Sequence, residues 1–494
     1  MCDGLRRRPP IAAAVVLLAG LAGPALTGCA VNPATGETQL ALIGEEQEIE
    51  MGRQAAAQVE ATIGLYEDAG LQGYVGDLGV AMARRTERPD LPWSVQVVDD
   101  PSVNAFALPG GFLYVTRGIL SYFNSEAELA SVLGHEIGHV TARHAVEQMS
   151  RQQLAALGLG VGSILFEEVR EVGGLLGTGL GLLFLEYGRD DERQADELGV
   201  RYMFEQSYDP REAIDVFQML ERHSGARGGG ALPGWLSTHP APEDRIERIQ
   251  AQIATLGSLE GTRVGRDPYL GRLDGLVFGP DPRNGYFEGA LFLHPALRFQ
   301  IRFPQGWERR NLARVVGATS PAGDAIVQLS LSDAAGHAEA ASRFFSQEGV
   351  QSSDVRQTTL GGFPATIGHF VAQTQDATLE GLAAFLDYDG WIVQLLGYTP
   401  VGGLAGHAGT FGDFFQSFAR LRDPAALAVQ PMRIELIALS RPTSIAELAR
   451  QRGSPVDAAT LAILNGVTVD EAIETGQVVK WVEGEAPPGW NAAP

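Results

Sequence analysis

The chain has 494 residues, 45% of them hydrophobic and 20% charged, which is an ordinary globular composition. Its length predicts about two to four domains. It carries 37 Lys and Arg against 60 Asp and Glu, and the formal net charge of −23 argues against a nucleic-acid partner. Both cysteines, Cys2 and Cys29, lie near the N-terminus, which excludes a disulfide framework and a cysteine nucleophile in the folded body. Any metal must therefore be held by His, Asp or Glu.

Residues 1–28 are predicted to be an export signal. Three arginines precede an apolar run, and Leu26-Thr27-Gly28-Cys29 ends it. This ending resembles the bacterial lipobox, which implies cleavage before Cys29 and a lipid on its thiol. An ordinary signal peptide or a short membrane anchor is the alternative. Ala30 is not the Asp typical of an inner-membrane retention signal. We therefore expect a lipid-anchored protein of the bacterial cell envelope that faces the periplasm, with the outer membrane favoured.

The segment from Ser125 to His139 carries the strongest chemical signal. Ser125 with Glu128 has the pattern of a capping box, so a helix is predicted to begin here. His135 and His139 are four residues apart, so their imidazoles leave one helix face and can share one Zn²⁺. Glu136 lies beside them, where a carboxylate can take a proton from metal-bound water. A pair of surface or capping histidines is the weaker alternative.

Residues 154–185 are rich in Gly and Leu, but four charged residues interrupt them. The apolar run that remains, 173–185, is too short to cross a bilayer as a helix. We expect a pair of packed helices near the active site, with a lid that dips into a membrane as the alternative.

A second helical segment, residues 187–196, offers a third metal ligand, which a catalytic zinc site needs beside its open position. Glu192 and Asp196 are four residues apart and share one helix face. We expect Glu192 to bind the metal and Asp196 to accept the distal N–H of a zinc-bound imidazole. A solvated acidic helix start is the alternative.

Four ordered motifs resemble the M48 family of metallopeptidases, and particularly its periplasmic lipoprotein branch. They cover residues 37–255 and comprise His135-Glu136-Ile137-Gly138-His139 with the residues to His144, Arg189-x-x-Glu192-x-x-Ala195-Asp196, Asn104 to Gly111, and Ser237-Thr238-His239-Pro240. The resemblance implies a mainly helical, zincin-like domain of the gluzincin kind that holds one Zn²⁺ per chain. Gly188 departs from the family, which more often has Ser there, but this position is not a ligand.

The resemblance also implies roles for two of these motifs. Asn104, Ala105, Phe106 and Ala107 would belong to an edge strand against which an extended substrate peptide adds, and a hairpin inside the core sheet is the alternative. His239 would approach the zinc, either to stabilise the oxyanion or to fill the fourth coordination position at rest. A loop histidine without either role remains open. His144 is expected to be structural. Arg245 is expected on a helix surface, with pairing to an active-site carboxylate as the alternative.

The motifs together predict a zinc endopeptidase in which Glu136 activates the zinc-bound water and passes the proton to the leaving amine. Its expected substrates are misfolded or misassembled envelope proteins. The alternative is a non-catalytic assembly factor that holds clients in the same groove. Glu136 favours the peptidase, because a pure binder does not need the base.

The rest of the chain predicts two further domains and a tail. Residues 270–425 alternate short strand-like runs with Gly and Pro turns and loosely resemble the small α/β fold of PsbP and Mog1 proteins. Residues 431–483 show strand, helix, helix, strand, an order that resembles the glycan-binding LysM module. Pro442-Thr443-Ser444 replaces the usual Gly-Asp-Thr, so peptidoglycan binding and a structural role both stay open. The expected class is α+β, with boundaries 1–28, 29–260, 270–425, 431–483 and a disordered tail at 484–494.

Overall fold

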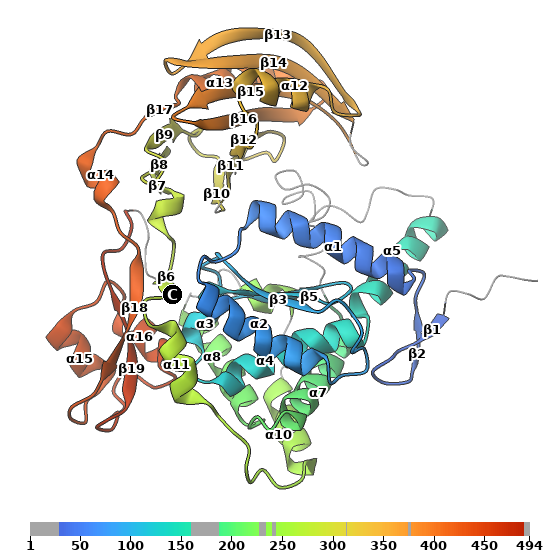
Figure 1. The fold of residues 1–494 in the computed structure, drawn as a ribbon, viewed down its shortest axis with the longest axis vertical. Helices are drawn as coiled ribbons and strands as arrows, with labels where there is room; N and C mark the ends of the chain where they lie inside the picture. The colour runs from blue at the N-terminus through green and yellow to red at the C-terminus, as the bar shows by residue number, and fades with distance from the viewer. Residues whose placement is uncertain are drawn as a thin grey trace, which may run out of the picture.

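The computed structural model describes residues 29–159, 187–226, 234–239, 244–312, 314–373 and 377–488. The predicted signal peptide, residues 160–186 of the Gly- and Leu-rich stretch and the end of the predicted tail lie outside these ranges. Within them, no helix combines the length and the apolar character that a membrane span needs. Helices and several sheets are mixed, which confirms the predicted α+β class (Figure 1).

The first half of the chain forms a helical body around a small sheet. Its helices are α1 (Glu45–Thr62), α2 (Ala69–Ala83), α3 (Arg117–Tyr122), α4 (Glu126–Thr141), α5 (His144–Leu159), α7 (Arg189–Glu205), α8 (Glu212–Ala226), α9 (Gly234–Thr238), α10 (Arg245–Thr255) and α11 (Arg266–Leu273). Its strands are β1 (Cys29–Val31), β2 (Thr38–Leu40), β3 (Ser94–Val98), β4 (Ala105–Leu108) and β5 (Phe112–Thr116). The sheet order is β3-β5-β4, with β3 parallel and β4 antiparallel to β5.

Helix α4 is the centre of this body and is buried from Ala127 to Thr141. The Ser125 hydroxyl caps it by accepting a hydrogen bond from the Glu128 amide at 3.0 Å. The Glu128 carboxylate turns back to the amide of Asn124 at 2.8 Å, one residue before the position that the capping-box pattern predicts.

Glycines bring α4 and α7 into close contact. A Cβ on Gly134 would lie 2.9 Å from the carbonyl oxygen of Gly199, and a Cβ on Gly138 would lie 3.1 Å from that of Ala195. Only glycine allows this approach. The contact places the start of α7 directly beside the histidines of α4.

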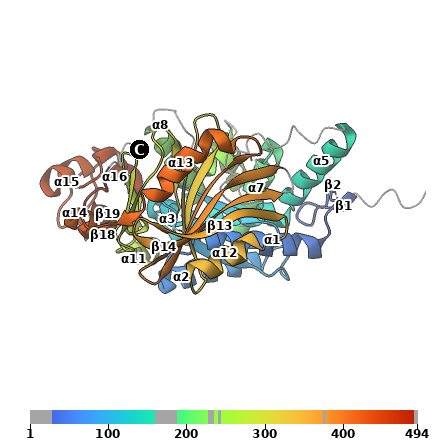
Figure 2. The ribbon, with the colours of Figure 1, turned by 90° about the horizontal axis from the view of Figure 1, so that it is seen from above.

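Residues 286–420 form a separate α/β domain above the helical body (Figures 1 and 2). A seven-stranded antiparallel sheet has the order β10-β11-β12-β16-β15-β14-β13, and a four-stranded sheet has the order β17-β9-β8-β7. Helix α13 (Leu404–Gln416) and helix α12 (His337–Phe345) pack in two different hydrophobic clusters on the large sheet. The strands are β7 (Tyr286–Glu288), β8 (Leu291–His294), β9 (Phe299–Arg302), β10 (Glu308–Asn311), β11 (Val315–Thr319), β12 (Ile326–Ser332), β13 (Val350–Leu360), β14 (Phe363–Gln373), β15 (Thr378–Tyr388), β16 (Trp391–Pro400) and β17 (Ala419–Arg420).

The C-terminal module contains β18 (Met432–Ala438), α15 (Ile445–Arg452), α16 (Ala458–Leu464) and β19 (Val478–Glu483), reached through α14 (Pro424–Ala428). Its sheet includes a third strand, β6 (Val277–Phe278), which precedes the α/β domain in sequence and pairs with β18. The module shares one hydrophobic core with the helical body. The buried Lys480 ammonium donates to the carbonyl oxygens of Ser121 and Phe123 at 2.8 and 2.7 Å, which ties β19 to the end of α3.

Candidate metal centre

Four buried side chains from three helical segments converge at the middle of α4. They are His135 and His139 on α4, Glu192 in the first turn of α7, and His239 just after α9. The Nε2 atoms of His135 and His139 are 3.0 Å apart, and the Nδ1 atom of His239 is 3.3 Å from Nε2 of His135. The Glu192 carboxylate lies 3.6 Å from His135, 3.4 Å from His139 and 2.8 Å from His239.

Three of these separations, at 3.3, 3.4 and 3.6 Å, are close to those of a tetrahedral metal site, and the other two, at 3.0 and 2.8 Å, are shorter. Zinc bonds to nitrogen and oxygen of about 2.0–2.2 Å place neighbouring ligand atoms roughly 3.3–3.5 Å apart at the tetrahedral angle. Three imidazoles and one carboxylate are also the donor types that zinc prefers. Burial holds the pKa of His139 well below its usual value, which favours the neutral imidazole that a metal requires. Burial alone would raise the pKa of Glu192, but the surrounding histidines hold it well below its usual value, so this donor is ionised.

Asp196 and Arg245 fix the orientation of His135. The Asp196 carboxylate accepts from the distal Nδ1 of His135 at 2.9 Å and from Arg245 Nε and Nη2 at 2.6 and 2.7 Å. Arg245 also lies 3.2 Å from Glu192. The expectation that Arg245 lies on a helix surface is wrong: it is 3% exposed, because two buried carboxylates need a cation between them.

A hydrogen-bond relay holds His139 from the other side. Its distal Nδ1 lies 2.9 Å from Nδ1 of His144, whose Nε2 lies 2.9 Å from the Gln194 amide oxygen. The same oxygen accepts from Asn32 in the loop between β1 and β2 at 3.0 Å. With a metal on Nε2, His139 donates to His144, and His144 donates to Gln194. His144 is therefore not a metal ligand but contacts one directly.

Glu136 points to the metal site from the next position on α4 and is 1% exposed. Its Oε1 accepts a hydrogen bond from the indole Nε1 of Trp235 at 3.1 Å and lies 3.5 Å from Nε2 of His239. Its Oε2 is buried without a hydrogen-bond partner among the described residues. One oxygen of the Glu136 carboxylate is therefore hydrogen-bonded, and the other can accept a hydrogen bond from a water molecule.

Strand β4 forms the outer edge of its sheet beside α4. The Thr116 amide donates to the carbonyl of Asn104 at 3.0 Å, and hydrogen-bonded pairs alternate along an antiparallel ladder. The main-chain groups of Ala105 and Ala107 therefore point away from β5, while the Phe106 ring stacks on Tyr114 at 5.2 Å. Among the described residues no strand pairs with this edge, but Ala105 is fully buried, so β-augmentation here requires the site to open.

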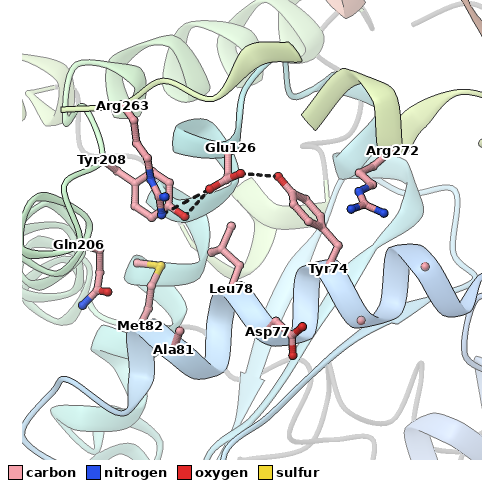
Figure 3. Close-up of a pocket in the computed structure, with 12 residues that line it drawn as sticks. Tyr74, Asp77, Leu78, Ala81, Met82, Glu126, Gln206, Tyr208, Arg263 and Arg272 are labelled. Atoms are coloured by element: carbon pink, nitrogen blue, oxygen red, sulfur yellow. Dashed lines mark hydrogen bonds and ion pairs between the residues drawn. The ribbon is translucent and has the colours of Figure 1, made fainter. Parts of the chain in front are cut away.

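A pocket of about 510 Å³ lies elsewhere (Figure 3). Glu126 at the start of α4 accepts from the hydroxyls of Tyr74 and Tyr208 at 2.9 and 2.6 Å, and Arg263 lies 3.5 Å away. Glu126 precedes His135 by nine residues, or roughly 13 Å along a helix. This pocket therefore lies between α2, the start of α4 and α11, away from the metal centre.

The sequence did not point to Trp235 and predicted no site role for His144, while the pairing of Arg245 with an active-site carboxylate was the alternative and is what the structure shows. Trp235 stands four residues before His239, so both rings leave α9 on one face. An aromatic residue at that spacing from a candidate ligand was the available signal. Arg245 offered no local signal, because its partner Asp196 lies 49 residues away along the chain.

Two solved structures show a likeness to part of the chain. Cyanobacterial PsbP from Synechocystis has a TM-score of 0.23 at 14% identity, with 27% of this chain and 94% of that one covered. LpqN from Mycobacterium tuberculosis has a TM-score of 0.21 at 15% identity, with 25% of this chain and 83% of that one covered.

Sequence comparison concerns the part of the chain that holds the metal centre. The mitochondrial metalloendopeptidase OMA1 of Arabidopsis thaliana is 34% identical over 220 residues, which cover 44% of this chain and 42% of that protein. The beta-barrel assembly-enhancing protease of Escherichia coli is 30% identical over 213 residues, which cover 40% of this chain and 42% of that protein. The chain thus matches less than half the length of these curated relatives. Residues 70–253 match Peptidase family M48, and this segment contains all four converging side chains, so it is a zinc metallopeptidase domain of that family.

Proposed function

We propose that this chain is a zinc endopeptidase that cleaves unfolded or misassembled proteins of the bacterial cell envelope. The observation that carries the proposal is the close spacing of His135, His139 and Glu192 with the buried carboxylate of Glu136 beside them. The free edge of β4 supports a substrate bound as an extended chain, which an unfolded protein offers at any point.

Each residue of the site would have a separate role in peptide hydrolysis. Bound zinc would lower the pKa of a water molecule and polarise the substrate carbonyl. Glu136 takes the proton from the attacking water and delivers it to the nitrogen of the leaving amine. Ala105 and Ala107 align the peptide through main-chain hydrogen bonds. Asp196 keeps the proton of His135 on Nδ1 and leaves Nε2 free to bind.

His239 acts as a gate in this proposal. Its Nδ1 stands among the other donor atoms, at the position a catalytic site must open for water. A histidine that stabilises an oxyanion would instead leave that position free and point an N–H at the substrate oxygen. The geometry therefore supports a latent enzyme that becomes active when His239 moves away.

The N-terminal sequence and the names of the relatives support a location in the cell envelope. Cys29 would carry a lipid and hold the protein at the outer membrane, facing the periplasm. Relatives named beta-barrel assembly-enhancing proteases support a role in envelope protein quality control. Residues 431–483 would bind peptidoglycan or support the helical body. Their packing in the core of that body supports the structural role.

The test uses the soluble chain beginning at Ala30, with zinc content and cleavage of casein measured with and without a chelator. We expect zinc at one ion per chain and cleavage that the chelator abolishes. Glu136→Gln should keep zinc and lose hydrolysis, because it removes only the base. His239→Ala should raise the rate.

The outcomes separate the candidate functions. A Glu136→Gln variant that still cleaves casein would refute the mechanism. The latent geometry also favours a second candidate, an assembly factor that holds clients without cutting them. That candidate would be supported if Glu136→Gln restored envelope assembly in cells as well as the parent does. A large loss of rate in His239→Ala would replace the gate by the oxyanion role.

A further inference from the structure

Trp235 lies at the centre of the closed site and is 1% exposed. Its indole stacks on His239 at 4.9 Å with an interplanar angle of 23°, and it meets the edge of His135 at 5.2 Å. The Trp235 carbonyl accepts from the amide of His239 at 2.9 Å, so both residues belong to one helical turn. Displacing one of them therefore displaces the other.

The indole fills an apolar pocket next to the metal centre. The pocket is lined by Val132, Val200, Ala213, Val216, Phe217 and Ile249, and only about 10 Å³ of cavity remains beside the ring. This is roughly the space of a single water molecule. A large side chain is therefore required to fill the pocket, and in this state the protein supplies it.

The pocket suits an aromatic ring and disfavours a cation. The Arg245 guanidinium lies 4.9 Å from the Trp235 ring and 4.3 Å from that of Phe217, which makes a cation–π stack. Its polar neighbours His135 and Asp196 are already paired with each other. A cationic side chain in this pocket would lose its hydration and lie beside the buried Arg245 cation.

The indole also holds the candidate base. Its Nε1 donates to Oε1 of Glu136 at 3.1 Å, so this oxygen is occupied while the indole is in place. Indole nitrogen can only donate, so it cannot accept the proton that Glu136 must pass on. The same ring thus fills the pocket and restrains the base.

We propose that Trp235 occupies the subsite for a substrate side chain next to the scissile bond, and that this subsite selects large aromatic or aliphatic residues. The inference rests on the proposed peptidase function and names its substrate class. A peptide with such a residue takes the place of the indole, frees Glu136 and removes His239 from the donor set in one movement. A peptide with a Lys or Arg at that position does not.

The test compares three variants of the mature chain. Trp235→Ala removes the ring, and Trp235→Phe keeps a ring but removes the N–H donor. Trp481→Phe is the matched control, because Trp481 is equally buried and its Nε1 donates to the Gly453 carbonyl at 3.0 Å, in the C-terminal module. Circular dichroism and zinc content establish that each variant is folded and loaded.

The first readout is binding without catalysis. The zinc-free chain is titrated with a short fluorescein-labelled peptide of Ala and Ser that has one central Phe, and with versions that carry Ala or Lys there. Trp235→Ala should bind the Phe peptide about tenfold more tightly than the parent, with no gain for the Lys peptide. Equal affinities of Trp235→Ala for the Phe and Lys peptides would overturn the proposal.

The second readout is the set of bonds cut in unfolded casein, mapped by mass spectrometry. The parent should cut beside aromatic and large aliphatic residues, and Trp235→Phe should cut the same bonds faster while Trp481→Phe matches the parent. Cuts beside Lys and Arg at the same frequency would overturn the subsite. If Trp235→Ala does not fold, Trp235→Phe decides through both readouts. A gain in Phe-peptide binding without any cleavage would contradict the peptidase function and leave the subsite standing.

Discussion

Replacing Asp196 by alanine should affect zinc binding and folding separately, because this carboxylate has two different partners. It accepts from the distal nitrogen of His135 at 2.9 Å and pairs with the buried Arg245 at 2.6 and 2.7 Å. The first contact orients a metal ligand. The second neutralises a buried guanidinium.

The two losses can be estimated from these contacts. Loss of a partner to a metal-bound imidazole costs roughly tenfold to a hundredfold in metal affinity, or about 1.4–2.8 kcal/mol. Removal of one member of a buried ion pair costs about 3–5 kcal/mol of folding free energy. Arg245 keeps Glu192 at 3.2 Å, so we expect the folding cost at the lower end of that range.

Zinc affinity is measured by competition with a chromophoric chelator, and stability by urea unfolding of the zinc-free chain. Asp190→Ala is the control on the same helix: its partner is Arg193, but its side chain is 94% exposed, so the cost should be about 0–1 kcal/mol. In the double variant Asp196→Ala, Arg245→Met, the loss of folding free energy should be smaller than the sum of the losses in the two single variants, because no guanidinium is left unpaired. Unchanged zinc affinity in Asp196→Ala would refute the orienting role.

Three further predictions concern separate parts of the chain. Glu192→Ala leaves three imidazoles in place, so elemental analysis should show weakened zinc binding, and loss of zinc once His239→Ala is added; full occupancy in the double variant would contradict this ligand set. Cys29→Ser should abolish palmitate labelling in cells, and labelling at the parental level would reject the lipobox. Burial lowers the pKa of His294 from 6.5 to about 4. The unfolded chain therefore binds the extra proton, and up to roughly 3 kcal/mol of α/β-domain stability should be lost as the pH falls from 6.5 to 4. Urea unfolding of His294→Leu should show a flatter pH dependence, and an unchanged slope would exclude His294 as its source.

The candidate ligands could be predicted because their signal is local. Residues four apart in a helix lie on the same face, whatever the rest of the fold. This spacing separates His135 from His139, and Glu192 from Asp196 on a second helix. The α+β class followed from periodicity in the same way. What brings the two helices together is the contact between Gly134 and Gly199, which no spacing rule reveals.

The parts that sequence reasoning missed depend on contacts across long stretches of chain. Lys480 donates to carbonyl oxygens 359 and 357 residues earlier in sequence, which makes the C-terminal module part of the core beside α4. Arg245 was assigned to the surface because most helix arginines lie there. Its burial depends on two carboxylates of α7, and only the fold brings them to it.

The pairing of β6 with β18 has a consequence for how this protein is assembled. Phe278 and Met432 face each other in an antiparallel pair, so the chain leaves the helical body and returns to it at adjacent positions. The α/β domain is therefore an insertion between Phe278 and Met432, whose Cα atoms are roughly 5 Å apart in such a pair. A short hairpin turn would close the gap and leave both the helical body and the C-terminal sheet whole. Because its two ends lie this close, we expect that deletion of the α/β domain would leave β6 and β18 paired.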